Sequence, residues 1–198
     1  MKAFHIPIRT LILLIAVFLS ACSSLPDSSN DTQITDIRQI NQFHLTGKIA
    51  FINPQKRHSA NLYWRQVQNN YDIRLTTLLG ISLAKIEGGR QQIKIQADGE
   101  TYQSNAPNRL VENVIGWPIP VDQLANWVLG RHQGVVMSVD QDKRAKKVLV
   151  RINADEEWML TYHDYKKIGN IELPGRIECE RYQNRLILKI NQWSELSQ

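Results

Sequence analysis

The sequence predicts a mainly β domain, an antiparallel sheet that curls into a barrel-like shape with two short helices across its mouth. Three observations support this fold class. Apolar and polar residues alternate through most of the chain after residue 42, as in strands with one buried face. Turn residues such as Asn69-Asn70 and Asp98-Gly99 join these segments, as in antiparallel hairpins. Two stretches near the middle have helical spacing instead.

The composition is that of a globular protein with a core. The 198 residues are 42% hydrophobic and 22% charged, with two cysteines, unlike a disordered or disulfide-rich chain. The formal charge of +5 includes Lys2 and Arg9, and it falls to +3 without the first 21 residues, which contain no acid. This mild excess of positive charge does not indicate a nucleic-acid partner.

Residues 1–21 have the features of a cleaved lipoprotein signal peptide. A basic front precedes the apolar run 11–19, which is too short for the ~20 residues of a membrane-spanning helix. The sequence Leu19-Ser20-Ala21-Cys22 then matches the lipobox of bacterial lipoproteins. We therefore predict cleavage before Cys22 and lipidation of its thiol. A plain secretory signal followed by an unrelated cysteine is the alternative.

Lipidation of Cys22 would leave Cys179 without a partner for an internal disulfide. Cys179 shares one side of an alternating stretch with Ile177, so we predict a buried small hydrophobe rather than a nucleophile. Ser23 follows Cys22, where the inner-membrane retention signal of enteric bacteria has Asp. The predicted location is therefore the outer membrane, with the anchor at Cys22 and the domain facing the periplasm.

Residues 22–40 are expected to be a flexible tether, because they begin as a polar, turn-rich stretch without apolar periodicity. Ile34 and Ile37 have helical spacing, which predicts a short amphipathic helix where the tether meets the domain. The domain itself is predicted to span residues 41–198.

The domain is expected to begin with a meander of six strands. The alternating segments are 43–51, 60–64, 71–76, 81–87, 91–97 and 101–104. Two helical stretches follow, at 108–115 and 121–129, and Gly116 and Gly130 end them. Strands are predicted again at 147–153, 158–163, 176–180 and 185–191. A long sheet with one apolar face must curl or be covered, which favours the barrel with helices at its mouth.

The sequence contains no recognisable catalytic or metal-binding motif. It has no Gly-rich phosphate loop, no Cys-x-x-Cys and no Gly-x-Ser-x-Gly nucleophile elbow. The histidines beyond residue 22 are His44, His58, His132 and His163, none with an acid or cysteine at ligand spacing. We therefore expect no catalytic residue, no metal, no cofactor and no enzymatic activity. The basic run 143–147 is interpreted as a solvated hairpin, with contact to anionic lipid or lipopolysaccharide as the alternative.

The loop between the third and fourth predicted strands is unusually apolar. Leu78 and Leu79 stand there beside Gly80, where turn residues are normally polar. The two leucines could fold inward, or they could form a tip that enters a membrane or contacts cargo.

Several segments together resemble the LolB family of outer-membrane lipoprotein receptors. They are Gly116–Gly130 with its Trp-Pro-Ile-Pro sequence, the loop Leu75–Gly80, Trp158-x-x-x-Tyr162, and Leu188-Lys-Ile-x-x-Trp193. The resemblance extends over nearly the whole chain after Cys22. It implies an incomplete, half-open antiparallel β-barrel in which short helices form a lid over an apolar cavity.

The resemblance also implies a function. A protein of this family is expected to accept acylated lipoproteins from the periplasmic carrier LolA and to insert them into the inner leaflet of the outer membrane. The expected partners are LolA, the acylated cargo and outer-membrane lipid, and the receptor is expected to be a monomer. The alternatives are a structural or assembly lipoprotein without lipid cargo, or a lipid-degrading enzyme with an unrecognised site.

Residue roles follow from the same resemblance. The family's protruding leucine corresponds to Leu79, but Leu78 replaces the proline that precedes it, so either leucine could project. Acyl chains need an apolar host, because each buried CH₂ is worth ~0.8 kcal/mol. The residues expected to line that host are Leu45, Ile49, Leu62, Trp64, Ile73, Leu75, Leu83, Ile93, Ile95, Trp117 and Trp127.

Overall fold

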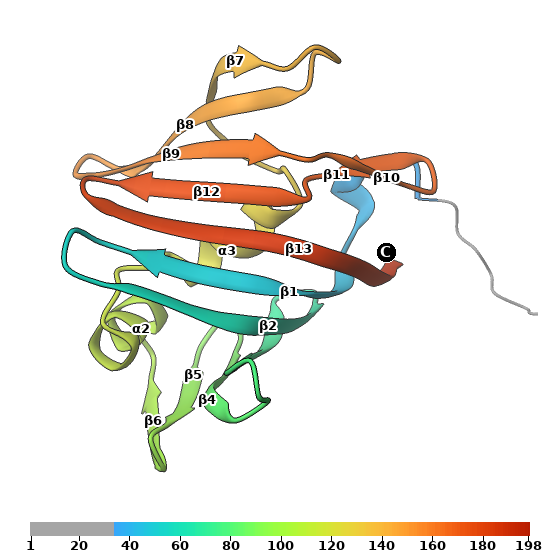
Figure 1. The fold of residues 1–198 in the computed structure, drawn as a ribbon. Coiled ribbons are helices and arrows are strands. Elements are labelled where there is room, and N and C mark those ends of the chain that lie inside the picture. The colour runs from blue at the N-terminus through green and yellow to red at the C-terminus, as the bar shows by residue number, and fades with distance from the viewer. Residues whose placement is uncertain (1–33) are drawn as a thin grey trace, which may run out of the picture. The chain divides into compact units, whose positions relative to one another are not determined.

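The computed structural model describes residues 34–198, so the predicted signal peptide and Cys22 lie outside the described residues. Within 34–198, one antiparallel sheet of eleven strands dominates the fold (Figure 1). Its strands are β1 (Gln42–Ile52), β2 (Arg57–Val67), β3 (Asn70–Thr76), β4 (Ser82–Gly88), β5 (Ile93–Ala97), β6 (Glu100–Ser104), β7 (Val135–Val139), β8 (Ala145–Asn153), β9 (Glu156–His163), β12 (Arg176–Arg181) and β13 (Asn184–Ser197). A separate two-stranded sheet pairs β10 (Lys166–Ile168) with β11 (Ile171–Leu173).

The large sheet is curved but not closed. Its strand order is β6-β5-β4-β3-β2-β1-β13-β12-β9-β8-β7, so β6 and β7 form the two edges. The first and last strands, β1 and β13, pair antiparallel in the middle. The predicted half-open antiparallel barrel is therefore confirmed, with the six-strand meander running from β1 of this central pair to the edge strand β6.

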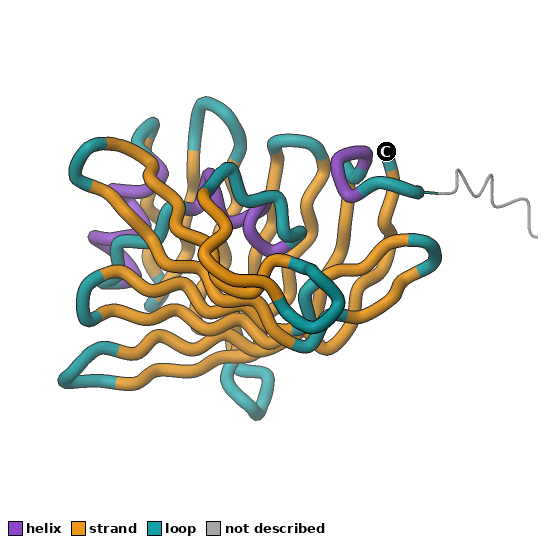
Figure 2. Tube along the Cα trace, turned by 90° about the horizontal axis from the view of Figure 1, so that it is seen from above, coloured by secondary structure: helices purple, strands orange, loops and turns teal. Residues whose placement is uncertain are grey.

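Two helices cover one face of the curved sheet. They are α2 (Pro107–Ile115) and α3 (Val121–Val128), which follow β6 directly in the chain (Figures 1 and 2). Pro107 occupies the first turn of α2, and Gly116 ends that helix with a left-handed backbone (φ +82°). Val121, Leu124, Trp127 and Val128 of α3 are buried, so this helix seals the apolar face of the sheet as the predicted lid.

The predicted strands and helices are all present, but three observed strands were not predicted. The edge strand β7 contains the run Val135-Val136-Met137 and has all of its residues exposed, so it has no alternating pattern to detect. The strands β10 and β11 have three residues each, which is too short for a periodic signal.

Leu83 does not lie on the inner face, and the prediction for this residue was wrong. Leu75 pairs with Ala84 and Thr76 with Ser82, so Leu83 is the extra residue of a β-bulge. Ala84 and Ile86 are buried in its place, and Leu83 is 43% exposed. The bulge shifts the alternation of β4 by one residue.

Residues 34–40, assigned above to the tether, pack against the domain. Asp36 caps a single 3₁₀ turn, η1 (Ile37–Gln39), by accepting a hydrogen bond from the Arg38 amide at 2.8 Å. The guanidinium of Arg131 donates to the carbonyl oxygens of Ile37 and Ile40, and the Ile40 side chain is buried. The folded domain therefore begins before residue 41, and the short helix is a 3₁₀ turn.

Candidate functional site

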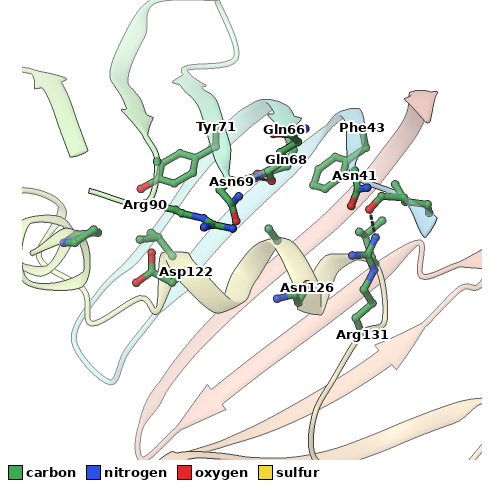
Figure 3. Close-up of a pocket in the computed structure, with 16 residues that line it drawn as sticks. Asn41, Phe43, Gln66, Gln68, Asn69, Tyr71, Arg90, Asp122, Asn126 and Arg131 are labelled. Carbon is green, nitrogen blue, oxygen red and sulfur yellow. Dashed lines mark hydrogen bonds between the residues drawn. The ribbon is translucent and has the colours of Figure 1, made fainter. Parts of the chain in front are cut away.

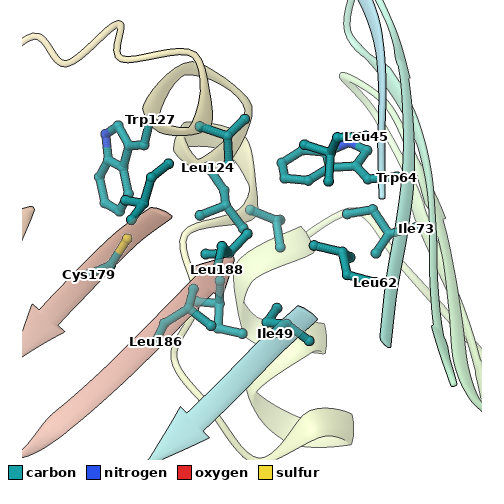
Figure 4. Close-up of a cluster of buried hydrophobic side chains, with 14 of the residues drawn as sticks. Leu45, Ile49, Leu62, Trp64, Ile73, Leu124, Trp127, Cys179, Leu186 and Leu188 are labelled. Carbon is teal, nitrogen blue, oxygen red and sulfur yellow. The ribbon is translucent and has the colours of Figure 1, made fainter. Parts of the chain in front are cut away.

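Two spaces of opposite character lie next to α3. One is a polar pocket of ≈ 680 Å³ between α3 and the ends of β1–β3 (Figure 3). The other is an apolar space between the lid and the inner face of the sheet (Figure 4). None of the residues that the sequence predicts to line a cavity borders the polar pocket, whereas several of them border the apolar space.

Every residue that lines the apolar space is hydrophobic. The sheet contributes Ile49, Phe51, Leu62, Trp64, Ile73, Leu75, Ile86 and Leu188, and the lid segment contributes Val111, Ile115, Ile119, Val121 and Leu124. In Figure 4, Leu124 of α3 faces Leu62 and Trp64 of β2. The lid and the sheet therefore present matching apolar surfaces to each other.

The apolar space is almost completely filled by these side chains. Its volume is ≈ 30 Å³, about the volume that one molecule occupies in liquid water. Pockets that bury a small-molecule ligand have volumes of roughly 300–1,000 Å³. An acyl chain could enter only if the lid moved away from the sheet or the lining side chains rearranged.

Ten of the eleven residues predicted to line the cavity are buried in the core, and Leu83 is the exception. Five of the ten border the remaining space: Ile49, Leu62, Trp64, Ile73 and Leu75. Leu45, Ile93 and Ile95 are buried without bordering it. Trp117 packs against Phe51, with ring centroids 5.4 Å apart, and Trp127 packs against Trp158 at 5.7 Å.

The lid residues that border the space were missing from the predicted lining. Val111, Ile115 and Leu124 do occupy the apolar sides of the predicted helices, so their periodicity was a usable signal. Ile119 lies between Pro118 and Pro120 and belongs to no periodic segment. Its burial depends on how the linker between the helices packs.

A hydrogen bond connects the two helices of the lid. The backbone amide of Val121, at the start of α3, donates to the side-chain oxygen of Asn108 on α2 at 3.1 Å. The helices differ in how firmly they are held, because α3 has four buried residues and α2 has one, Val111. The α2 side of the lid therefore has fewer fully buried side chains.

The loop between β3 and β4 carries the two leucines. Thr77 donates its amide to Ile81 O at 2.8 Å, Gly80 donates to Thr77 O at 3.0 Å, and Gly80 has a left-handed backbone (φ +83°). This is the arrangement of a three-residue hairpin loop that ends on a left-handed glycine. Leu78 is 81% exposed and Leu79 89%, so both project from the loop, which Figure 1 draws in green beside β4. The alternative in which they fold inward is wrong.

The remaining candidates have structural explanations. Cys179 is fully buried, as predicted, and burial raises the pKa of its thiol. In the basic hairpin, Arg144 pairs with Asp140, Asp142 and Glu172, while the lysines are exposed. Within residues 34–198, no group of three or more acidic, histidine or cysteine side chains could hold a metal ion. None of the helices in that range is long and apolar enough to cross a membrane.

Comparison with known proteins gives a consistent set of relatives. The family model "Outer membrane lipoprotein LolB" matches residues 41–193. A protein named outer-membrane lipoprotein LolB from Shewanella loihica is 32% identical over 182 residues, covering 90% of this chain and 84% of that protein. A protein of the same name from Shewanella oneidensis is 30% identical over 184 residues, covering 91% and 86%.

A solved structure shares the fold. It is a LolA superfamily protein from Nitrosomonas europaea, with a TM-score of 0.52 over 78% of this chain and 86% of that one. The two sequences are 11% identical, so this likeness concerns the fold alone. It agrees with the half-open sheet described above.

Proposed function

The chain belongs to the LolB family of outer-membrane lipoproteins, and on this premise we propose that it is a receptor for acylated lipoproteins. In this proposal it is anchored in the outer membrane through acylated Cys22, with its domain in the periplasm. It receives cargo from the periplasmic carrier LolA and inserts that cargo into the inner leaflet of the outer membrane. The reaction is a transfer between apolar hosts and requires no covalent chemistry.

The observation that carries the proposal is the wholly hydrophobic lining of the space under the lid. Each CH₂ of an acyl chain that leaves water for such a surface gains ~0.8 kcal/mol. A carrier, a receptor and a bilayer can therefore pass the chains along only if each offers an apolar surface. The lining of the lid and the sheet is such a surface.

Reception requires the lid to open, because the closed space of ≈ 30 Å³ cannot hold an acyl chain. The side chains that close it would make room by separating, and the acyl chain would then cover the surfaces that they expose. This exchange keeps the cost of opening low, since apolar contacts between lid and sheet are replaced by apolar contacts with the cargo. Because Val111 is the one fully buried residue of α2, this helix is the element expected to move first.

Delivery is assigned to the loop with Leu78 and Leu79. Two fully projecting leucines are costly to expose to water and favourable to bury in a leaflet. The loop is short and closed by hydrogen bonds from Thr77 and Gly80, so its tip is held in place rather than free to fold back. We assign to it the contact with outer-membrane lipid at which acyl chains leave the receptor.

One observation favours a second candidate function. The core is nearly filled, as expected of a structural or assembly lipoprotein that carries no lipid. The two functions differ in whether the core opens to admit acyl chains. A binding experiment distinguishes the receptor from the structural lipoprotein.

The experiment uses a fluorescent hydrophobic probe that brightens in apolar surroundings. The probe is expected to bind to the chain and to be displaced by a lipoprotein carrying its acyl chains. The same lipoprotein without acyl chains should leave the signal unchanged. Equal displacement by both forms, or no probe binding, would contradict the receptor function and favour the structural one.

A further inference from the structure

The polar pocket beside α3 is not accounted for by acyl-chain binding. It has a volume of ≈ 680 Å³, and Val121, Asp122, Ala125 and Asn126 of α3 line one side of it. In Figure 3, Tyr71, Arg90 and Asp122 lie toward one end, and Asn41 and Arg131 lie toward the other. A pocket of this size falls within the range that accommodates small ligands.

The pocket offers hydrogen-bonding groups of both kinds. Asn41, Gln68 and Asn126 line it, and their side-chain amides have no hydrogen-bond partner within residues 34–198. Asn41 and Gln68 are exposed and Asn126 is half-buried, so all three amides are accessible to a ligand. Each amide presents a donor and an acceptor. Arg90 adds a cation, and its guanidinium lies 3.0 and 3.2 Å from the side-chain amide of Asn69.

Tyr71 and Asp122 add two further polar groups without partners. The Tyr71 side chain is buried, and its hydroxyl has no hydrogen-bond partner in the described part of the chain. A buried tyrosine hydroxyl normally finds a partner. Burial and the nearby carboxylate of Asp122 raise the pKa of Tyr71 to about 12, which keeps the hydroxyl protonated. Asp122, in the first turn of α3, makes no ion pair within residues 34–198.

The pocket adjoins the apolar space. Val121 lines both of them. Phe43 of the pocket and Trp64 of the apolar space pack edge to face, with ring centroids 5.5 Å apart. A molecule with acyl chains under the lid would therefore place its adjoining polar part in this pocket.

We propose that the polar pocket holds the peptide main chain that follows the acylated cysteine of the cargo lipoprotein. This inference rests on the proposed function and adds to it a site for the protein part of the cargo. A peptide main chain presents alternating N–H and C=O groups, which unpartnered amides, a cation and a carboxylate can pair with in turn. Of the two arginines that line the pocket, Arg131 already donates to the carbonyl oxygens of Ile37 and Ile40, and the carboxylate of Asp122 would repel a phosphate headgroup.

The mature chain from residue 22, with Cys22→Ala to remove the anchor, allows a direct test. Its affinity is measured for two probes with identical acyl chains. One is a triacylated cysteine amide, and the other carries four neutral residues after the same cysteine. The peptide-bearing probe is expected to bind about tenfold more tightly, because its main chain adds a few hydrogen bonds to the pocket.

Arg90→Ala and Asn126→Ala test the pocket itself. Each is expected to reduce the affinity for the peptide-bearing probe by about two- to tenfold and to leave the affinity for the cysteine amide unchanged. Gln123→Ala is the matched control on α3, because Gln123 does not line the pocket. Thermal unfolding of each variant checks that the domain is intact.

The outcomes separate the two proposals. Equal affinity for both probes, or an equal loss for both in the variants, would overturn the peptide site while leaving acyl binding in place. Failure of the cysteine amide to bind at all would overturn the proposed function and this inference with it. If the variants weaken binding of a diacyl phospholipid as strongly as binding of the lipopeptide, the pocket recognises a lipid headgroup and the peptide assignment is wrong.

Discussion

At the scale of single residues, the backbone geometry of the β3–β4 loop keeps the apolar side chains of Leu78 and Leu79 exposed. The three-residue loop places them at its tip, and the left-handed Gly80 closes it. A residue other than glycine at position 80 would be strained there. The leucines therefore stay exposed although burial would be favourable, as the proposed contact with lipid requires.

Replacement of Leu79 with Glu tests that role. Because the side chain is exposed and packs on nothing, the free energy of unfolding should change by no more than about 0.5 kcal/mol. Cargo should still be received, but its delivery to liposomes should fail, since a carboxylate resists entry into a leaflet. The measurement is the amount of cargo that remains bound to the receptor against the amount in liposomes.

Two further variants show whether the effect of Leu79→Glu is specific to that position. Leu78→Glu shows whether the second leucine shares the role. Leu83→Glu is the control, because Leu83 is exposed on β4 but lies outside the tip. If Leu79→Glu delivers cargo as well as the unmodified protein does, the loop has no part in delivery.

At the scale of elements, the lid is short and unevenly attached. Four residues of α3 are buried, and one of them, Leu124, borders the apolar space. Only Val111 of α2 is buried. A lid with few fully buried residues in one of its helices is consistent with the proposed opening around acyl chains.

Leu124→Ala should convert the filled space into a cavity. The expected destabilisation is about 2–5 kcal/mol, as for other buried leucines, because the cavity collapses only in part. An apolar probe should bind more tightly to this variant, because room is already present. Gln123→Ala, on the same helix but away from the space, should change neither quantity. An unchanged probe affinity in a destabilised Leu124→Ala variant would place the probe elsewhere.

The sequence predicted the strands well where one face is buried and the other is exposed to solvent. In β1, for example, Phe43, Leu45, Ile49 and Phe51 alternate with exposed or half-buried residues, and the whole strand was found. The prediction failed where that rule fails. The edge strand β7 is exposed on both faces, and the bulge at Leu83 shifts the alternation of β4.

The candidate site was predictable in composition but not in volume. Trp64 and Leu62 belong to a strand whose apolar side must be covered, which periodicity alone indicates. Whether Leu124 and Ile119 fill the space against them depends on packing between elements far apart in the chain. The polar pocket was missed for the same reason, since Tyr71 and Asp122 meet only in the folded domain.

At the scale of the whole molecule, the topology joins the start and the end of the domain. Gln42 pairs with Ser197, and the backbone N–H of Asn41 donates to Ser197 O at 2.9 Å. The guanidinium of Arg131 donates to the carbonyl oxygens of Ile37 and Ile40, which fixes the 3₁₀ turn η1 that precedes β1. Residues 37–41 are therefore held at a fixed point of the domain by contacts with residues far along the chain.

Replacement of Cys22 with Ala, behind an ordinary secretory signal, should release the protein from the membrane. The variant should be a soluble periplasmic protein that still accepts acylated cargo, because the apolar space is formed by residues between 49 and 188. Fractionation and cargo binding in vitro are the measurements. A folded variant that accepts no cargo would show that the anchor takes part in reception.

The central claim is that acyl chains of the cargo occupy the space between the lid and the sheet. A lipoprotein whose acyl chain carries a photoreactive diazirine tests this most directly, with the cross-linked residues identified by mass spectrometry. The account predicts cross-links to the residues that line the space, such as Leu62, Ile73 and Leu124. Cross-links confined to the Leu79 loop or to exposed residues of the sheet, with cargo bound, would contradict it.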